Sequence, residues 1–269
     1  MKFGLFRNNS IIGLLLVAVG GLLLYLRSRA EGRLLEIGFT ETVTAQEVRD
    51  LHAQIAAELG PGGFSQLVEL KGKLRCAAPL TAELSGQPCA YYTMSVEERY
   101  EETYQEQDGE GGTRTATRTG SNIVASNTQS ALFQLHDATG ELDVNPTGAE
   151  IHPRQAVSRF EPFAGGPSIT MGGFVLQVGV GLGARRVLGY QYSESILPLD
   201  SQLYLLGEAT DTSGQLTVQK PREKKPFIIS LKTEEELVRG AKGSIKWYLY
   251  GAIAAFVIGA VFILAKLLK

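Results

Sequence analysis

The residues with the chemistry for catalysis or metal binding are few and widely spaced in this chain. The thiols are Cys76 and Cys89, and the imidazoles are His52, His136 and His152. No two of them form a C-x-x-C pair or an i, i+4 histidine pair, the spacings that gather zinc ligands. The sequence also contains no G-x-S-x-G, H-E-x-x-H or phosphate-loop motif. We therefore expect no catalytic residue, no bound metal and no cofactor within these residues.

The surroundings of the cysteines and of His136 indicate structural roles. Cys89 follows a proline and precedes two aromatic residues, which is typical of a small, buried hydrophobic side chain. A disulfide with Cys76 is the alternative if the domain faces an oxidising compartment. His136 precedes Asp137 and lies near Asp143, an acid–base combination, but no nucleophile accompanies them. The run from Asp137 to Gly140 is explained more simply as a turn.

An acidic cluster between residues 97 and 110 is a candidate cation site. It consists of Glu97, Glu98, Glu101, Glu102, Glu106, Asp108 and Glu110. The cluster lacks the regular D-x-D-x-D-G spacing of a calcium loop, and glycines accompany its end at 109, 111 and 112. We interpret it as the solvated tip of a hairpin.

Residues 164–184 combine seven glycines with an apolar, charge-free run. The order G-x-G-x-x-A at 179–184, with Asp200 downstream, matches part of a dinucleotide-binding fingerprint. Residues 185–192 read as a strand where that motif requires a helix, so we expect no nucleotide site. We predict that the segment faces a membrane or a partner, and a lid over an internal apolar cavity is the alternative. The residues of this candidate surface are Ile169, Met171, Phe174, Val175, Leu176, Val178, Val180 and Leu182.

Alternating polarity predicts the strands that position these residues. Over residues 66–75, the even-numbered positions 68 to 74 should face a core and the charged positions between them, including Glu69 and Lys71, should face solvent. We place Val68, Leu70, Tyr92 and Leu205 in the core of one domain. Further strands are expected at 89–97, 132–135, 141–144, 186–196, 203–209 and 226–230.

Capping boxes predict where two helices begin. Thr44 with Glu47 opens an amphipathic helix over 44–59, which the glycines from Gly60 should end. Thr233 with Glu236 opens a second helix that runs without a linker into the last apolar segment.

Several blocks resemble the GIDE domain of membrane-anchored ubiquitin ligases from mitochondria and the chloroplast envelope, which also occurs in bacterial relatives. They read VELKGKLRC, PLTAELSGQPCAYY, FQLHDATGELDVNPTGAEI, GYQYSESILPLDSQLYLLGEA and PFIISLKTEEEL, and lie between about residue 35 and the C-terminal tail. The positions with expected structural roles are Gly72, Pro79, Leu80, Ser85, Gly86, Cys89, Tyr91, Tyr92, Asp137, Gly140, Pro146, Gly148 and Gly207.

The resemblance implies an α+β, β-rich domain, barrel-like or a sandwich, between two transmembrane helices. The eukaryotic ligases also carry a RING, which holds two zinc ions through about eight Cys and His ligands. This sequence has five such residues, so we expect a short, RING-less, bacterial-type member to which ligase chemistry does not transfer.

Two charge-free runs predict the membrane spans. Residues 11–26 would span about 24 Å as a helix, and flanking Lys and Arg residues can extend that reach. An uncleaved anchor fits this run better than a cleaved signal peptide, because arginines stand where cleavage would fall. Residues 247–265 begin with interfacial aromatics and are followed by lysines.

The expected organisation is a tail at 1–10, a first span at 11–27, the GIDE-like domain at 28–240, a second span at 247–265 and a tail at 266–269. Two spans place both termini on one side. Six Lys and Arg residues flank the spans on the domain side and four on the terminal side, which favours a cytoplasmic domain. The resemblance favours the opposite side, and both alternatives stay open, as does a plasma or an internal membrane for a bacterial protein.

The formal net charge of −2 argues against nucleic acid as a partner, since nucleic acid attracts basic surfaces. We expect an integral membrane protein whose domain is an interaction or assembly module. Its partners would be the lipid bilayer and another protein, and a homo-oligomer is also considered. The alternatives are a ligase-family component that needs a separate catalytic partner, and a structural or transport-associated envelope protein.

Overall fold

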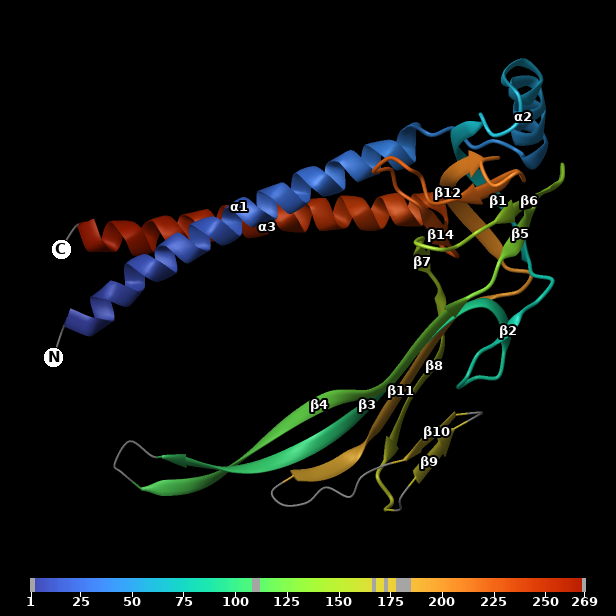
Figure 1. Cartoon of the computed structure of the whole chain (residues 1–269). Helices are drawn as coiled ribbons and strands as arrows, with labels where there is room; N and C mark the ends of the chain where they lie inside the picture. Colours follow the sequence, from blue (N-terminus) through green and yellow to red (C-terminus); the bar gives the residue numbers. More distant parts are fainter. Residues whose placement is uncertain (1–2, 108–111, 166–167, 172–173, 178–184, 268–269) are drawn as a thin grey trace. The chain divides into compact units, whose positions relative to one another are not determined.

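The computed structural model describes residues 3–107, 112–165, 168–171, 174–177 and 185–267. These residues form two compact units (Figure 1). One unit contains two long helices and the short segment 223–226. The other contains residues 43–222 and 227–231, and holds one helix and all the strands.

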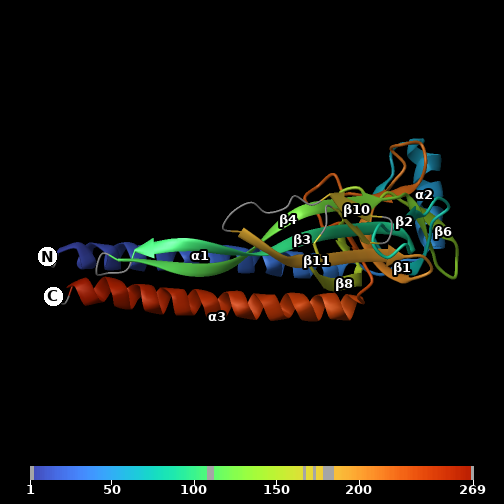
Figure 2. The same cartoon turned by 90° about the horizontal axis from the view of Figure 1, so that it is seen from below.

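The helical unit is an antiparallel pair of α1 (Phe3–Phe39) and α3 (Glu234–Leu267). Figure 2 shows the two helices side by side, with both chain ends at the same end of the pair. Glycines allow the backbones to approach closely: a Cβ atom on Gly13 would lie 3.0 Å from the carbonyl oxygen of Gly259. Gly20 faces the ring of Phe256. The helices are continuous and longer than the two apolar runs that predicted them.

The β-rich unit begins with α2 (Ala45–Leu59). Thr44 and Glu47 form the predicted capping box, and Gly60 ends the helix with a positive φ of 82°. Ala45 and Val48 are buried, and Leu51 and Ile55 pack against the same core cluster. The amphipathic pattern therefore identified the buried side of this helix correctly.

Five strands close a small barrel. They are β1 (Ser65–Arg75), β5 (Phe133–His136), β6 (Glu141–Val144), β12 (Gln202–Thr210) and β13 (Thr217–Gln219). The ring runs β1-β5-β6-β13-β12 and closes by pairing of β12 with β1. Every pair is antiparallel except β6 with β13, which are parallel. This order and these directions are those of an OB fold, the five-stranded Greek-key barrel.

Two short strands extend the barrel sheet beyond β12. They are β14 (Ile228–Ser230), which pairs antiparallel with β12, and β7 (Glu150–His152), which pairs parallel with β14.

The second sheet is open and is built from segments inserted between barrel strands. It contains β2 (Leu80–Thr81), β3 (Pro88–Gln107), β4 (Thr113–Ser130), β8 (Arg154–Pro162) and β11 (Arg185–Pro198). Its order is β2-β3-β11-β8, and β4 pairs with β3 along the edge that β2 also uses. A separate hairpin consists of β9 (Ser168–Met171) and β10 (Phe174–Gln177).

The fold is α+β and β-rich, as expected, but it contains two buried clusters. Val68, Leu70 and Leu205 lie in the barrel cluster, whereas Tyr92 lies in the cluster of the open sheet. All four residues are buried within one compact unit, as predicted, but the core of that unit is divided into two clusters. The division arises because β3 pairs with β11 in the open sheet, so the inward side chains of β3 pack on a different sheet from those of the barrel.

Glu69 also differs from its predicted solvent-facing position. Its side chain is 1% exposed, accepts a hydrogen bond from Tyr204 Oη at 2.9 Å, and pairs with Lys71 Nζ at 3.1 Å. The neighbouring positions 71, 73 and 75 are exposed as predicted. A carboxylate is tolerated at this buried place because its oxygens find partners.

Candidate functional site

The buried carboxylate of Glu194 joins two of the sequence blocks that carry the family resemblance. Glu194 lies on β11 and is 1% exposed. Its two oxygens accept hydrogen bonds from the backbone N–H groups of Leu84 at 2.7 Å and Ser85 at 2.9 Å. Gly86 follows with a φ of 68°, in the left-handed region that favours glycine. Glu194 thus holds the loop that contains Ser85 and Gly86, for which we expected a structural role.

A polar network surrounds Tyr92 at the start of β3. Its hydroxyl donates to Glu83 Oε1 at 3.0 Å, and Asn127 Nδ2 donates to the Tyr92 hydroxyl at 3.1 Å and to Glu83. Burial, followed by the neighbouring Glu83 carboxylate, raises the pKa of Tyr92 to about 12. The phenol therefore stays protonated at neutral pH and acts as a hydrogen-bond donor.

The two cysteines carry free thiols in the structure. Cys89 is fully buried, as predicted, and burial together with the nearby Glu194 carboxylate raises the pKa of its thiol to about 11. A thiol with so high a pKa is a poor nucleophile at neutral pH. Cys76 donates to the carbonyl oxygen of Leu132 at 3.3 Å.

Asp137 organises the hairpin between β5 and β6, as the turn interpretation required. One oxygen accepts from the N–H groups of Thr139 and Gly140, and the other accepts from the N–H of Ala45 at the start of α2. Burial alone would raise the pKa of Asp137, but the hydrogen bonds from Thr139 and from these backbone groups lower it. Asp137 thus fixes both the turn and the helix end.

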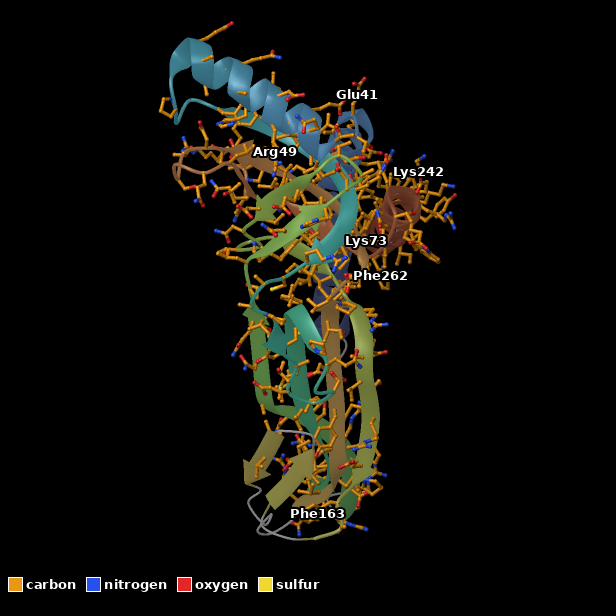
Figure 3. All side chains as sticks on the ribbon, turned by 90° about the vertical axis from the view of Figure 1, so that its right-hand side faces the viewer. Glu41, Arg49, Lys73, Phe163, Lys242 and Phe262 are labelled. Atoms are coloured by element: carbon orange, nitrogen blue, oxygen red, sulfur yellow. The ribbon has the colours of Figure 1, made fainter. Side chains whose placement is uncertain are left out.

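The candidate acid–base residues around this turn do not converge on one site. His136 pairs with Glu141 at 2.8 Å across the hairpin, and Asp143 accepts from Gln134 Nε2 at 3.0 Å. Arg49 of α2 donates to the carbonyl of Glu141, so the helix is held over the hairpin (Figure 3).

The most connected histidine–carboxylate pair was missed by the sequence analysis. Asp211 follows β12, is 3% exposed, and accepts from the N–H groups of Gly62 at 2.8 Å and Phe64 at 3.0 Å. His52 Nε2 lies 3.1 Å from the same carboxylate. The pair lies 159 positions apart in the chain, and no local pattern marks it. The Ser65 hydroxyl bonds to Glu208, and the hydrogen bonds from Gly62 and Phe64 indicate that Asp211 fixes the 60–64 loop.

Two carboxylates of the acidic cluster form ion pairs across β3 and β4. Glu102 pairs with Arg118 at 2.8 Å and Glu106 with Arg114 at 2.9 Å, each directly opposite on β3 and β4. Among the residues that the structure describes, no three His, Cys, Asp or Glu side chains lie close enough to hold a metal ion. Asp108 and Glu110 lie outside the described residues. The antiparallel pairing of β3 with β4 shows the expected hairpin, but Glu97 to Glu106 lie along β3 and not at a tip, and residues 108–111 lie outside the described residues.

The Gly-rich candidate surface is described in part. Ile169 and Met171 belong to β9, and Phe174, Val175 and Leu176 belong to β10. Val175 is 61% exposed. Val178, Val180 and Leu182 lie outside the described residues, as does the whole G-x-G-x-x-A run at 179–184. The strand β11 begins at Arg185, where a dinucleotide motif would require a helix.

Two of the glycines from the resembling blocks permit close packing in the barrel. A Cβ on Gly72 would lie 2.5 Å from the carbonyl oxygen of His136, which is closer than real contacts allow. A Cβ on Gly207 would lie 2.9 Å from the ring of Phe227. Gly148 has a φ of 79° in the turn that Pro146 begins. The remaining positions lie in or next to β2, β3 and their connection: Pro79 precedes β2, Leu80 begins it, Ser85 lies in the connection and Tyr91 lies on β3.

These features define a class of protein: a β-rich domain with an OB-like barrel, flanked in the chain by two apolar helices. The sequence profile of the GIDE family, described as E3 Ubiquitin ligase, matches residues 101–265. The chain belongs to this family. The matched range excludes the blocks at 66–92 in which the resemblance was first noted.

One relative extends the similarity to the rest of the chain. The Arabidopsis thaliana protein named E3 ubiquitin-protein ligase SPL1 is 23% identical over 253 residues, which cover 91% of this chain and 67% of that protein. No solved structure matches the chain.

Proposed function

We propose that residues 1–269 form a membrane-tethered interaction and assembly module of the GIDE family. The observation that carries this proposal is that polar residues of the family-like blocks form hydrogen bonds within the domain. Glu194, Asp137 and Glu83 each bond to other parts of the domain, and among the described residues no group of three or more His, Cys, Asp or Glu side chains could hold a metal ion. Such residues maintain a shaped surface, which is the requirement for a binding module.

The two helices support the membrane-spanning part of the proposal. Residues 11–32 and 234–264 are long and apolar enough to cross a bilayer, with a mean hydropathy of 2.1 each. In the most apolar stretch of each helix, only 11% and 17% of the residues are buried within the structure. Large side chains such as Leu14 and Val261 are exposed. A bilayer would cover these side chains. Because the pair is antiparallel, both termini would lie on one side.

The residues present do not fit the zinc sites of a RING. Cys76 follows β1 and bonds to the carbonyl of Leu132, and Cys89 lies at the start of β3 and bonds to the carbonyl of Leu80. The histidines contact carboxylates: His52 contacts Asp211, His136 contacts Glu141, and His152 contacts Glu150. These contacts are separate and pair each histidine with a single carboxylate. We derive no ligase step from residues 1–269.

A ligase-related role that depends on a separate catalytic partner is the second candidate. The similarity to the Arabidopsis ligase, which extends over 91% of this chain, favours it. In both candidates the domain between the spans contacts another protein.

The test uses the full chain, purified in a mild detergent or in nanodiscs. Its zinc content is measured by mass spectrometry, and its ability to build ubiquitin chains is assayed with activating and conjugating enzymes. We expect less than stoichiometric zinc and no chain formation, together with co-purification of a defined protein partner from its native membrane. Stoichiometric zinc or autonomous chain formation would overturn the proposal. A ligase activity that returns only with the co-purified partner would select the second candidate.

A further inference from the structure

The outer edge of β4 is the longest unpaired strand edge among the described residues of the open sheet. β4 has 18 residues and pairs with β3 only, along the whole length from Thr113 to Ser130. Unpaired N–H and C=O groups along such an edge form a template for another strand.

The distal part of β4 belongs to a two-stranded ribbon, which has fewer strands than a sheet needs to be stable on its own. Among the described residues, the pairing of β11 with β3 ends at Glu102, and residues 103–107 and 113–117 pair only with each other. Figure 1 shows β3 and β4 continuing past the end of β11. Nearly all side chains of this two-stranded ribbon are exposed. A two-stranded hairpin without an apolar face is marginally stable in water, and an added strand would support it.

The sequence of this edge is complementary to itself. Hydroxyl residues occupy every odd position: Thr113, Thr115, Thr117, Thr119 and Ser121. All five are exposed. The intervening arginines, Arg114 and Arg118, are already paired with glutamates of β3 on the other face. The hydroxyl face is therefore uniform, and cross-strand Thr–Thr and Thr–Ser contacts are favourable.

An antiparallel pairing of two copies about Thr117 would give hydrogen-bond partners to the unpaired backbone N–H and C=O groups of this edge. It places Thr117 opposite Thr117 of the second copy, Thr115 opposite Thr119, and Thr113 opposite Ser121. Arg118 then faces Ala116 and Arg114 faces Gly120, so no two like charges lie directly opposite. Beyond this stretch, Val124 is an extra residue where the β3–β4 register shifts. Such a bulge bends a strand and ends regular pairing.

The opposite edge of the sheet is protected. β8 carries Arg154, Arg159 and Glu161 and ends at Pro162, and charges and proline on an edge oppose strand addition. We propose that this chain forms a homodimer by antiparallel pairing of β4 with β4 of a second copy, centred on Thr117, to give a continuous sheet with the strand order β3-β4-β4-β3.

The first test is a cysteine cross-linking series on the full chain in nanodiscs or native membranes. Thr117→Cys should form a disulfide between two copies, identified by mass spectrometry of the linked peptide. Thr115→Cys or Thr119→Cys alone should cross-link weakly, whereas a mixture of these two variants should cross-link well. Equal cross-linking of all single variants would indicate random collision and would contradict the register.

The second test measures the oligomeric mass of the full chain by native mass spectrometry. The wild type should be a dimer. Replacing Thr115, Thr117 and Thr119 with Lys should weaken dimerisation on the order of tenfold, because three rungs then oppose like charges. The matched control replaces the same residues with Ser and should stay dimeric. Circular dichroism should show the same fold for both variants, since all three positions are exposed. A monomeric wild type, or a Lys variant that dimerises like the Ser variant, would overturn the proposal.

Discussion

The Glu69 carboxylate is a buried hydrogen-bond acceptor in the barrel. Replacing it with Ala would leave the Tyr204 hydroxyl buried without this acceptor, and we expect a loss of about 1–3 kcal/mol in the free energy of unfolding. Lys73→Ala on the same strand is the control, because this side chain is exposed and its removal should change stability by less than about 0.5 kcal/mol. Urea unfolding followed by circular dichroism measures both. Similar small effects would show that Glu69 is not held as described.

A second prediction at this scale concerns Asp211 and pH. The hydrogen bond from the Gly62 N–H, followed by those from Phe64 and His52, lowers the pKa of Asp211 below its ordinary value of 3.8. The unfolded chain therefore binds this proton more readily than the folded chain does. The stabilisation is fully present above about pH 3.8 and is lost as the pH falls through the lowered pKa.

The measurement compares the wild type with Asp211→Asn across a pH series. The difference in their free energies of unfolding should be constant between neutral pH and about pH 5, and should shrink below the unfolded-state pKa of about 3.9. Asp50→Asn, an exposed position on α2, is the control and should show a smaller effect at neutral pH. A difference that grows on acidification would contradict the assignment.

Residue patterns predicted side-chain burial well where neighbours along the chain decide it. The alternation in β1 placed Val68 and Leu70 correctly, and the turn at Asp137 followed from its own sequence. Glu69 and Asp211 were not predicted, because their burial depends on partners more than a hundred residues away. The sequence around a charged residue does not indicate whether such a distant partner exists.

At the scale of elements, capping boxes and hairpins were predictable and polar strands were not. Both capping boxes mark real helix starts, and the 133–144 hairpin has the predicted turn. The extent of β4 was not predicted, because its Thr- and Ser-rich sequence carries little apolar alternation and its strand form follows from pairing with β3. The three-residue strands β7 and β13 are too short to show a period.

The β9–β10 hairpin gives a prediction at this scale. We propose that it contacts a membrane or a partner, and Val175, which is 61% exposed, is its described outward side chain. Val175→Asp should leave the circular dichroism spectrum unchanged and reduce binding to liposomes or to a co-purified partner. Val175→Leu is the control and should preserve binding. Unfolding of the Asp variant would instead favour the lid interpretation, and unchanged binding would remove the hairpin from the interface.

At the scale of the whole molecule, the helix pair predicts how the chain lies in a membrane. Gly251 on α3 faces Leu23 on α1, and a Cβ atom added to Gly251 would lie 3.2 Å from the leucine side chain. Leu23→Cys together with Gly251→Cys should form an intramolecular disulfide in native membranes. Gly21, which faces open space, is the control: Gly21→Cys with Gly251→Cys should not cross-link. The opposite result, or tags at the two termini that report different sides, would contradict the antiparallel pair.

The closed ring of the barrel has a consequence for how the chain folds. β1 obtains its longest partner, β12, only after the whole open sheet has been synthesised, and β13 completes the ring later still. Closing so long a loop costs chain entropy before any ladder forms, so folding should be slow compared with domains of local contacts. The hairpin of β5 and β6 can form early, but its barrel partner β13 is synthesised much later. Only residues 231–233 separate the end of β14 from the start of α3, so the last strand of the barrel sheet and the second apolar helix are synthesised in close succession.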